Sequence, residues 1–313
     1  MGSVITQRDA AMTETNIKNE PESNIQDTGE MIRLKARRGE FSSPTTTVAP
    51  GFVQANLIVL PETYAADFRR FCKRNPVPCP LLAESKNIGG WDQLQSHIPG
   101  FTGEQIAANV DLRSDFPRYM VYDNGTLTKS HVQSLEGDWA ADHVGFLIGC
   151  SFSFDSALAL AGLPPAHTLW SRNVPMYRTT LSLCSAGAFV NSTYIVSMRP
   201  YQRKDIEKVR DITRPYLITH GEPVDWGWDA LERLGIADIS NPEYGDKPIT
   251  PDGAELVRGI GEGDEMLEPV FFGCGVTPQE AIQRAGLRGR VFAHAPGHMI
   301  VLDIRDSDII QKT

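Results

Sequence analysis

Short runs of apolar residues recur along the chain from about residue 51 onward, and they predict β-strands. The run HVGFLIG is almost continuously apolar, which is typical of a strand buried on both faces of a parallel sheet. In RYMVYDNGTL the run ends in Asp-Asn-Gly, which favours a tight hairpin turn. The strands predicted in this way cover residues 54–61, 143–149, 191–200, 267–273 and 298–304.

Other segments place their apolar residues at helical spacing. Tyr64, Phe68 and Phe71 recur at i, i+4 and i+7, so residues 62–75 present one apolar face, and Pro76 ends the predicted helix. The same spacing predicts further helices over 201–216 and 279–286.

The order of these elements predicts the fold class. Strands and helices alternate at both ends of the chain, whereas the middle is richer in Gly, Trp and Pro. We therefore expect an α/β protein with a three-layer α/β main domain formed by residues 31–168 plus 265–313. A smaller inserted α+β domain should cover residues 169–264.

Residues 1–30 differ in composition from the rest. They hold six acidic residues, two basic ones and no aromatic residue, so they cannot bury enough apolar surface to offset their ordering entropy. We expect a disordered acidic tail. The opening MGSVIT fits the loose myristoylation pattern at Gly2, but a single acyl chain anchors only marginally, so we expect no stable membrane association.

Charge and cysteine content narrow the partners and the compartment. The 313-residue chain has a formal net charge of −9, which argues against a nucleic-acid partner. Five cysteines and the absence of a signal-peptide pattern are typical of reduced intracellular thiols, so we expect a cytoplasmic protein. The sequence leaves open whether the protein forms a homo-oligomer.

Two Gly-Cys dipeptides each separate a predicted strand from a predicted helix, in FLIGCSFSFD and VFFGCGVTPQ. Small or hydroxylated residues follow Cys150 and Cys274. In the second segment Thr277 is suited to cap the helix and to form a capping box with Glu280, and Asp155 or Ser153 could cap the helix of the first. Helix N-termini favour anions, so these turns predict a carboxylate site that includes Ser151, Ser153, Gly275 and Thr277.

The two thiols allow two interpretations. At the start of a helix a cysteine can have a lowered pKa and act as a thiolate. Equally, the glycines can simply permit tight turns while Cys150 and Cys274 pack as inert apolar side chains. The pattern does not choose between them.

Two further segments carry side chains suited to catalysis or binding. SRNVPMYRT offers Arg172, Asn173 and Arg178, and a guanidinium can hold a carboxylate with two hydrogen bonds. FAHAPGH places His294 and His298 four residues apart, with Ala-Pro-Gly preventing a helix between them. One histidine acting as acid or base is favoured over a two-histidine metal site, although a divalent metal stays an alternative.

The sequence lacks the patterns of the common hydrolase and nucleotide sites. G-x-S-x-G, G-x-G-x-x-G and the P-loop pattern do not occur. We therefore expect a small carboxylate as substrate and no cofactor.

Several segments together resemble the D-glutamate cyclase family, also called a hydro-lyase family. The resemblance runs from about residue 51 to 304 and implies a larger α/β and a smaller α+β domain. It also implies conversion of D-glutamate to 5-oxo-D-proline with loss of water. The segments that carry it are GFVQANLIVLP, FCKRNPVPCPLL, FLIGCSFSFD, RNVPMYRT, IVSMRP, LGIADI, FFGCGVTPQ and HAPGHMIVLD.

Three positions depart from the family pattern. Asp155 stands where a Glu is usual, LCSAGAF is one residue short of a typical C-x-P-A-G-x-F, and PTTTVAPG lacks a Gly common before Ala-Pro-Gly. A hydro-lyase acting on another amino or hydroxy acid therefore stays an alternative, as does a non-catalytic domain that binds a small carboxylate.

Lactam formation needs an amine that loses protons, a carboxylate that loses an oxygen as water, and donors for the oxyanion. We expect the helix starts after the two cysteines to hold carboxylate oxygens and Arg172 or Arg178 to hold the α-carboxylate. The proton would be carried by His298, His294, Cys274 or Cys150.

Overall fold

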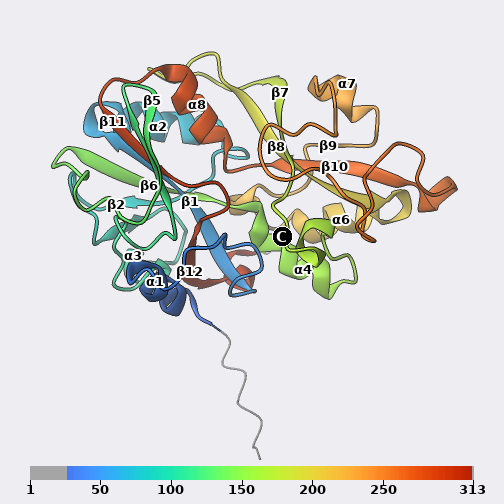
Figure 1. Cartoon of the computed structure of the whole chain (residues 1–313), viewed down its shortest axis with the longest axis horizontal. Coiled ribbons are helices and arrows are strands. Elements are labelled where there is room, and N and C mark those ends of the chain that lie inside the picture. The colour runs from blue at the N-terminus through green and yellow to red at the C-terminus, as the bar shows by residue number, and fades with distance from the viewer. Residues whose placement is uncertain (1–26, 312–313) are drawn as a thin grey trace, which may run out of the picture.

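The computed structural model describes residues 27–311 and contains two antiparallel sheets with helices packed against them (Figure 1). The predicted mixed α/β class is confirmed. The elements of one sheet fill the left half of Figure 1 and those of the other the right half, where α4 (Asp155–Leu160) lies below the strands.

The larger sheet, sheet A, has the strand order β3-β2-β6-β1-β11-β4-β5, and β12 also pairs with the first half of β1. A hairpin joins β4 to β5 through Asn124 and Gly125, both at positive φ, as the Asp-Asn-Gly sequence predicted. The strands are β1 (Phe52–Pro61), β2 (Leu81–Ser85), β3 (Leu94–Ser96), β4 (Tyr119–Asp123), β5 (Thr126–Val132), β6 (His143–Gly149), β11 (Arg290–His294) and β12 (Ile300–Arg305).

The expectation of a parallel sheet is wrong. Strand β6 is buried along its whole length, as its apolar run indicated, but it pairs antiparallel with β1 and with β2. Burial on both faces explains the apolar run without parallel pairing: Leu147 belongs to the core on one face of the sheet, and Phe146 and Ile148 to the core on the other. An apolar run reports burial and not strand direction.

The smaller sheet, sheet B, has the order β7-β8-β10-β9. Its strands are β7 (Met176–Ser182), β8 (Thr193–Gln202), β9 (Asp225–Trp226) and β10 (Leu267–Gly273). Strand β10 is central here, whereas the sequence prediction assigned residues 265–313 to the main domain. The predicted boundary therefore does not follow the sheets at this point, and the three-layer arrangement and the inserted domain stay predictions.

The helices predicted within 62–75, 201–216 and 279–286 are present as the helices α2, α6 and α8 bounded below, because each buries one face. Phe68 and Phe71 of α2 are fully buried and Tyr64 is half-buried. The helices are α1 (Gly29–Arg37), α2 (Glu62–Arg74), α3 (Gly103–Ile106), α4, α5 (Ala166–Leu169), α6 (Ile206–Thr213), α7 (Ala230–Leu234) and α8 (Thr277–Ala285), with 3₁₀ turns η1 (Ser151–Phe154), η2 (Arg203–Asp205), η3 (Leu217–Thr219), η4 (Gly263–Glu265) and η5 (Asp306–Ile309). No helix within residues 27–311 is long and apolar enough to cross a membrane.

The tail predicted for residues 1–30 extends too far along the chain, because Gly29 and Glu30 belong to helix α1. Helix α1 begins at Gly29, Thr28 accepts a hydrogen bond from the Met31 N–H as its cap, and Gly29 is buried against the Leu302 carbonyl. Residues 1–26, including Gly2, lie outside the described residues.

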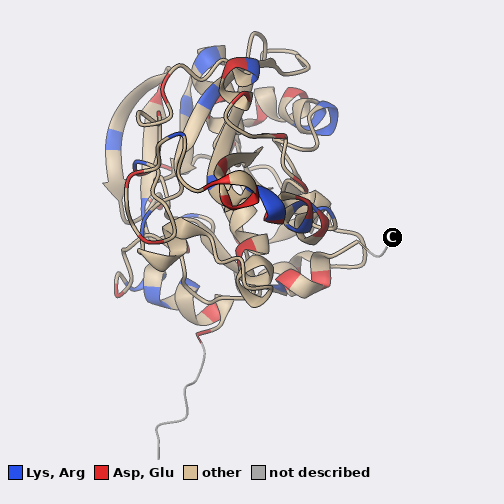
Figure 2. Ribbon diagram, turned by 90° about the vertical axis from the view of Figure 1, so that its right-hand side faces the viewer, with Lys and Arg blue, Asp and Glu red and all other residues tan. Residues whose placement is uncertain are grey.

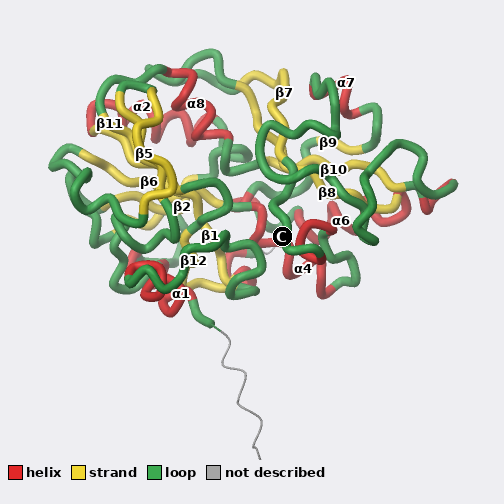
Figure 3. Tube along the Cα trace, in the orientation of Figure 1, coloured by secondary structure: helices red, strands yellow, loops and turns green. Residues whose placement is uncertain are grey.

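One apolar core joins the two sheets. It includes Leu57 and Leu147 of sheet A together with Val270 and Phe272 of sheet B, and Phe154 lies between them. A second core covers the other face of sheet A, where α2 and α8 pack. In Figure 3 the helices α2 and α8 lie at the top of the left half and α1 at its base, whereas α4 and α6 lie below the strands of the right half.

Charged residues of both signs are interspersed along the side of the molecule seen in Figure 2. Several pair on the surface, such as Arg210 with Glu207 and Arg233 with Asp225. The expected lack of a nucleic-acid partner stays a prediction.

Phe189 should be a major source of stability, because its fully buried ring lies 5.5 Å from Phe68 and 5.4 Å from Phe71, measured between ring centroids. We expect Phe189→Ala to lower the free energy of unfolding by about 3–5 kcal/mol, measured by urea denaturation. The neighbouring Val190→Ala is the control, since Val190 is exposed and its loss should change stability by less than about 0.5 kcal/mol. Equal effects of the two substitutions would contradict the packing described.

Candidate functional site at the junction of the two sheets

The two Gly-Cys turns lie side by side, one at the end of β6 and the other at the end of β10. Asn56 of β1 joins them: its Nδ2 donates to the Gly149 carbonyl at 3.1 Å, and a Cβ added at Gly275 would come within 2.0 Å of the same Nδ2. His220 Nε2 lies 3.0 Å from the Gly149 carbonyl on another side. Glycine is required at 275 by the approach of Asn56, and at 149 by the Ile218 carbonyl oxygen, which an added Cβ would meet at 2.4 Å. Neither glycine has a positive φ.

Of the two interpretations of the thiols, the structure supports packed side chains without a lowered pKa. Cys150 and Cys274 are both buried, and burial raises the pKa of Cys150 to about 12 and that of Cys274 to about 11. The Cys274 side chain packs against Met176 and Ile195, where a thiolate would lose its hydration. Both thiols therefore carry their protons at neutral pH.

The predicted caps are also wrong. Thr277 is the first residue of α8, and its hydroxyl binds both the backbone N–H and the carbonyl of Ile195 at 3.1 Å, so it fastens the helix to β8. Glu280 accepts hydrogen bonds from Arg178 and Tyr244 and forms no capping box. Neither α4 nor η1 has a side-chain cap, because Asp155 is engaged elsewhere.

Asp155 is held by Arg199, which reaches across from β8. Arg199 is fully buried, and its Nε donates to Asp155 Oδ1 at 3.0 Å. Its Nη1 and Nη2 donate to the hydroxyls of Ser197 and Ser151, each at 3.1 Å. Burial alone would raise the pKa of Asp155, but the Arg199 guanidinium outweighs it and holds that pKa below its usual value.

His167 completes this polar cluster. Its Nε2 lies 3.3 Å from Asp155 Oδ2, although the angles do not make a hydrogen bond. Its ring stacks on Phe152 at 5.7 Å between centroids, and burial lowers its pKa. The imidazole is therefore neutral at pH 7.

Sequence reasoning missed Arg199, His167 and Asn56. Arg199 carried a usable signal, because an arginine inside the apolar run IVSMRPY is seldom buried without a partner. His167 and Asn56 carried none, since their roles depend on neighbours that are distant in the chain.

The partners of His294 fix which nitrogen carries its hydrogen. Its Nδ1 lies 3.2 Å from the Leu57 N–H and 3.0 Å from Gln279 Nε2, so Nδ1 accepts and Nε2 carries the hydrogen of the neutral ring. Burial lowers the pKa of His294 to about 4.

His298 has the opposite tautomer. Its Nδ1 donates to the Pro296 carbonyl at 2.8 Å, which leaves Nε2 as the nitrogen that takes up a proton. Burial lowers the pKa of His298, although the carbonyls of Pro296 and Ser42 favour the imidazolium. Within residues 27–311 no three His, Cys, Asp or Glu side chains are grouped to hold a metal.

The two arginines of the segment SRNVPMYRT have different partners. Arg178 Nε donates to Glu280 Oε1 at 2.9 Å, so it is bound to the start of α8. Arg172 lies 3.9 Å from Asp246 and is partly exposed. Asn173 does approach the junction: its Oδ1 lies 3.4 Å from the Thr46 hydroxyl and beside Gly297.

A cavity of about 270 Å³ opens at this junction. Its walls come from the PTTTVAPG segment, from the first residues of β1, from η1 and α4, and from η5. Thr47, Gln54, Asp155, Ser156 and Asp306 are among the residues that line it. The volume lies near the lower end of small-molecule sites.

The cavity wall contains backbone strain. Thr47 and Ala49 have φ values of 68° and 45°, in the left-handed region that side chains with a Cβ avoid. This is the segment that lacks the family's glycine, so Thr47 takes a conformation that glycine would adopt without strain.

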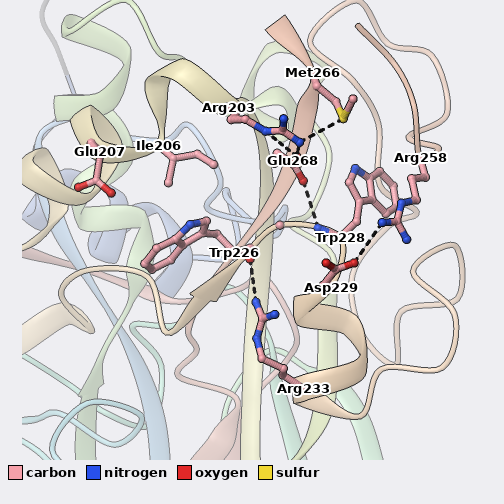
Figure 4. A pocket seen from close by; sticks show the side chains of 11 residues that line it. Arg203, Ile206, Glu207, Trp226, Trp228, Asp229, Arg233, Arg258, Met266 and Glu268 are labelled. Atoms are coloured by element: carbon pink, nitrogen blue, oxygen red, sulfur yellow. Dashed lines mark hydrogen bonds and ion pairs between the residues drawn. The ribbon is translucent and has the colours of Figure 1, made fainter. Parts of the chain in front are cut away.

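A different hollow of about 400 Å³ lies at the far end of sheet B (Figure 4). Its guanidinium groups are paired, Arg203 with Glu268 and Arg258 with Asp229. None of the predicted catalytic or substrate-binding residues lines this hollow, and none lines the 270 Å³ cavity either. The junction of the sheets is the better candidate site because both Gly-Cys turns and the buried pair of Arg199 and Asp155 lie there.

Comparison with known proteins points to one family. A family model described as D-glutamate cyclase matches residues 144–303, which include both Gly-Cys turns, Arg199 and the two histidines. A Rubrobacter xylanophilus protein is 44% identical over 88% of this chain and 95% of its own, and a Schizosaccharomyces pombe protein is 40% identical over 87% and 83%. A Bordetella pertussis protein is 42% identical over 89% and 90%. All three are named "Putative hydro-lyase".

Fold and sequence thus define a mixed α/β protein with a polar junction between two antiparallel sheets. The chain belongs to the D-glutamate cyclase family.

Thr47→Gly should stabilise the protein by about 0.5–1 kcal/mol in chemical denaturation. It removes a left-handed strain of about 1–2 kcal/mol and restores about 0.5–1 kcal/mol of chain entropy to the unfolded state. Thr46→Gly is the matched control, because Thr46 lacks a positive φ, and it should lower stability. A loss of stability in both variants would show that Thr47 is not strained.

The neutral state of His294 should make stability depend on pH. Its pKa falls from 6.5 to about 4 on folding, so its stabilising contribution is complete above pH 6.5 and is lost as the pH falls towards 4. The free energy of unfolding, measured by urea titration at several pH values, should fall between pH 6.5 and 4 by up to ~3 kcal/mol less in His294→Asn than in the wild type. His131 is exposed, so His131→Asn should keep the pH dependence of the wild type. Parallel curves for wild type and His294→Asn would contradict the assignment.

Proposed function

We propose that this protein is a lyase that interconverts D-glutamate and 5-oxo-D-proline plus water. The observation that carries the proposal is the meeting of the two Gly-Cys turns at Asn56, within the part of the chain that the D-glutamate cyclase model matches. The names of the relatives support the hydro-lyase class. The D-glutamate substrate is taken from the family's description and is the part most in need of a test.

Ring closure needs no external reagent. The amine nitrogen bonds to the γ-carboxyl carbon, and one carboxylate oxygen leaves. Of the three ammonium protons, one stays on the lactam nitrogen and two leave with that oxygen as water. The protein must fold the substrate, move the protons and stabilise the oxyanion.

The two histidines suit complementary parts of this chemistry. His298 is neutral with Nε2 as its proton acceptor, so it can take a proton from the ammonium group. His294 is neutral with its hydrogen on Nε2, so it can donate a hydrogen bond to a developing oxyanion. The thiols of Cys150 and Cys274 are protonated, which disfavours them as bases.

The carboxylates of the substrate would lie against the Gly-Cys turns. Ser151, Ser153, Gly275 and Asn173 border this region, and Arg172 is the guanidinium of the predicted pair that is not bound to Glu280. Asp155 stands where a longer glutamate is usual in the family, and this difference favours a second candidate function. The same site would then dehydrate another small amino or hydroxy acid.

The test is the reverse reaction in ¹⁸O-labelled water. The protein should convert 5-oxo-D-proline to glutamate with one label in the γ-carboxylate, detected by mass spectrometry. We expect His298→Gln and His294→Asn each to lower turnover by ~100-fold, as is typical of lost acid–base groups. Cys274→Ala should lower it by less than tenfold.

Melting temperatures near that of the wild type serve as the folding control for all three variants. Near-normal rates in both histidine variants would refute the assigned proton carriers. If no amino or hydroxy acid gains or loses water with the intact protein, a non-catalytic carboxylate-binding domain replaces the enzyme.

A further inference from the structure

The cavity at the sheet junction has an unusual supply of hydrogen-bond acceptors without donors. Gln54 Oε1 and Asp306 Oδ1 are buried, and neither has a hydrogen-bond partner. Asp155 Oδ2 also lacks one, apart from His167 at 3.3 Å with unsuitable angles. All three side chains line the same 270 Å³ cavity.

These side chains are held in place by other bonds. Gln54 Nε2 donates to the carbonyls of Thr45 and Val48, so its amide nitrogen is occupied and Oε1 is the end left over. Arg199 binds Asp155 Oδ1 and leaves Oδ2. The Asp306 N–H donates to the Gly51 carbonyl, which fixes η5 at the cavity wall.

Unpaired buried acceptors are energetically costly, so their gathering at one cavity indicates a ligand that brings donors. The lining includes two carboxylates and neither lysine nor arginine. Arg199 forms a salt bridge with Asp155, whereas Asp306 forms no salt bridge within residues 27–311. A cationic donor group is therefore favoured.

We propose that Gln54, Asp155 and Asp306 form the subsite that binds the ammonium group of an amino-acid substrate. A primary ammonium brings three N–H donors and one positive charge, which matches these three acceptors when Asp306 is in its ionised form. The inference rests on the proposed function, because it assigns the amino end of that substrate to this cavity. The carboxylates would then point towards the Gly-Cys turns.

The raised pKa of Asp306 allows its charge to change when such a ligand binds. Burial first, and then the nearby charge of Asp155, raises the pKa of Asp306 to about 8, so the empty cavity does not hold two adjacent negative charges at neutral pH. A bound ammonium would favour the ionised form. Arg305 and the Tyr216 phenol also face this carboxyl, and the guanidinium works against the rise.

Calorimetry with two probes of the same carbon skeleton tests the subsite. D-glutamate carries the ammonium group and glutarate lacks it. The wild type should bind D-glutamate at least tenfold more tightly than glutarate, and Asp306→Asn should abolish the difference while leaving glutarate binding unchanged. Asp308→Asn is the matched control, since this exposed carboxylate of η5 undergoes the same substitution outside the cavity and should keep the preference.

A third probe needs no variant. N,N,N-trimethyl-D-glutamate keeps the positive charge but has no N–H donor, so the wild type should bind it no better than glutarate. The subsite is refuted if Asp306→Asn keeps the preference for D-glutamate, if the trimethylated compound binds as well as D-glutamate, or if the wild type binds none of the three.

The failure of the subsite differs from that of the proposed function. Turnover of D-glutamate by the wild type with an unchanged KM in Asp306→Asn would refute the subsite alone. A preference for D-glutamate that depends on Asp306, without any exchange of label from water, would refute the reaction alone.

Discussion

The buried ion pair between Arg199 and Asp155 is the interaction on which the junction of the two sheets depends. Arg199 belongs to sheet B and Asp155 follows sheet A, and the guanidinium lies against the rings of Phe154 and Phe272, 5.1 Å from each centroid. Such a pair gains little over an apolar core, but removing one partner leaves an uncompensated buried charge. It therefore fixes how the two halves meet more than it adds stability.

The rest of the site is arranged around that constraint. Ser151 is bound to the same guanidinium, so the first Gly-Cys turn is tied to sheet B. Asn56 and Gly275 bring the second turn against it, and Thr277 fastens α8 to β8. Cavity walls drawn from both halves can hold a ligand whose position neither half would define alone.

Burial decides the chemistry of the ionisable groups here. The thiols keep their protons and the imidazoles stay neutral, because charged forms would lose hydration that the surrounding apolar side chains cannot replace. A position just before a helix would by itself lower the pKa of a thiol. Here the nearby N-terminus does not offset the burial of Cys150 and Cys274.

The sequence by itself determined the mixed α/β class, most of the longer elements and the family, because apolar spacing and motif segments are local properties of the chain. It also singled out both Gly-Cys turns and the two histidines. Only the tertiary structure decided the antiparallel pairing, the membership of β10 in sheet B, and the protonated state of the thiols. The roles of Gln54, Asn56, His167 and Arg199 were also decided there, since each depends on partners that only folding brings within hydrogen-bond distance.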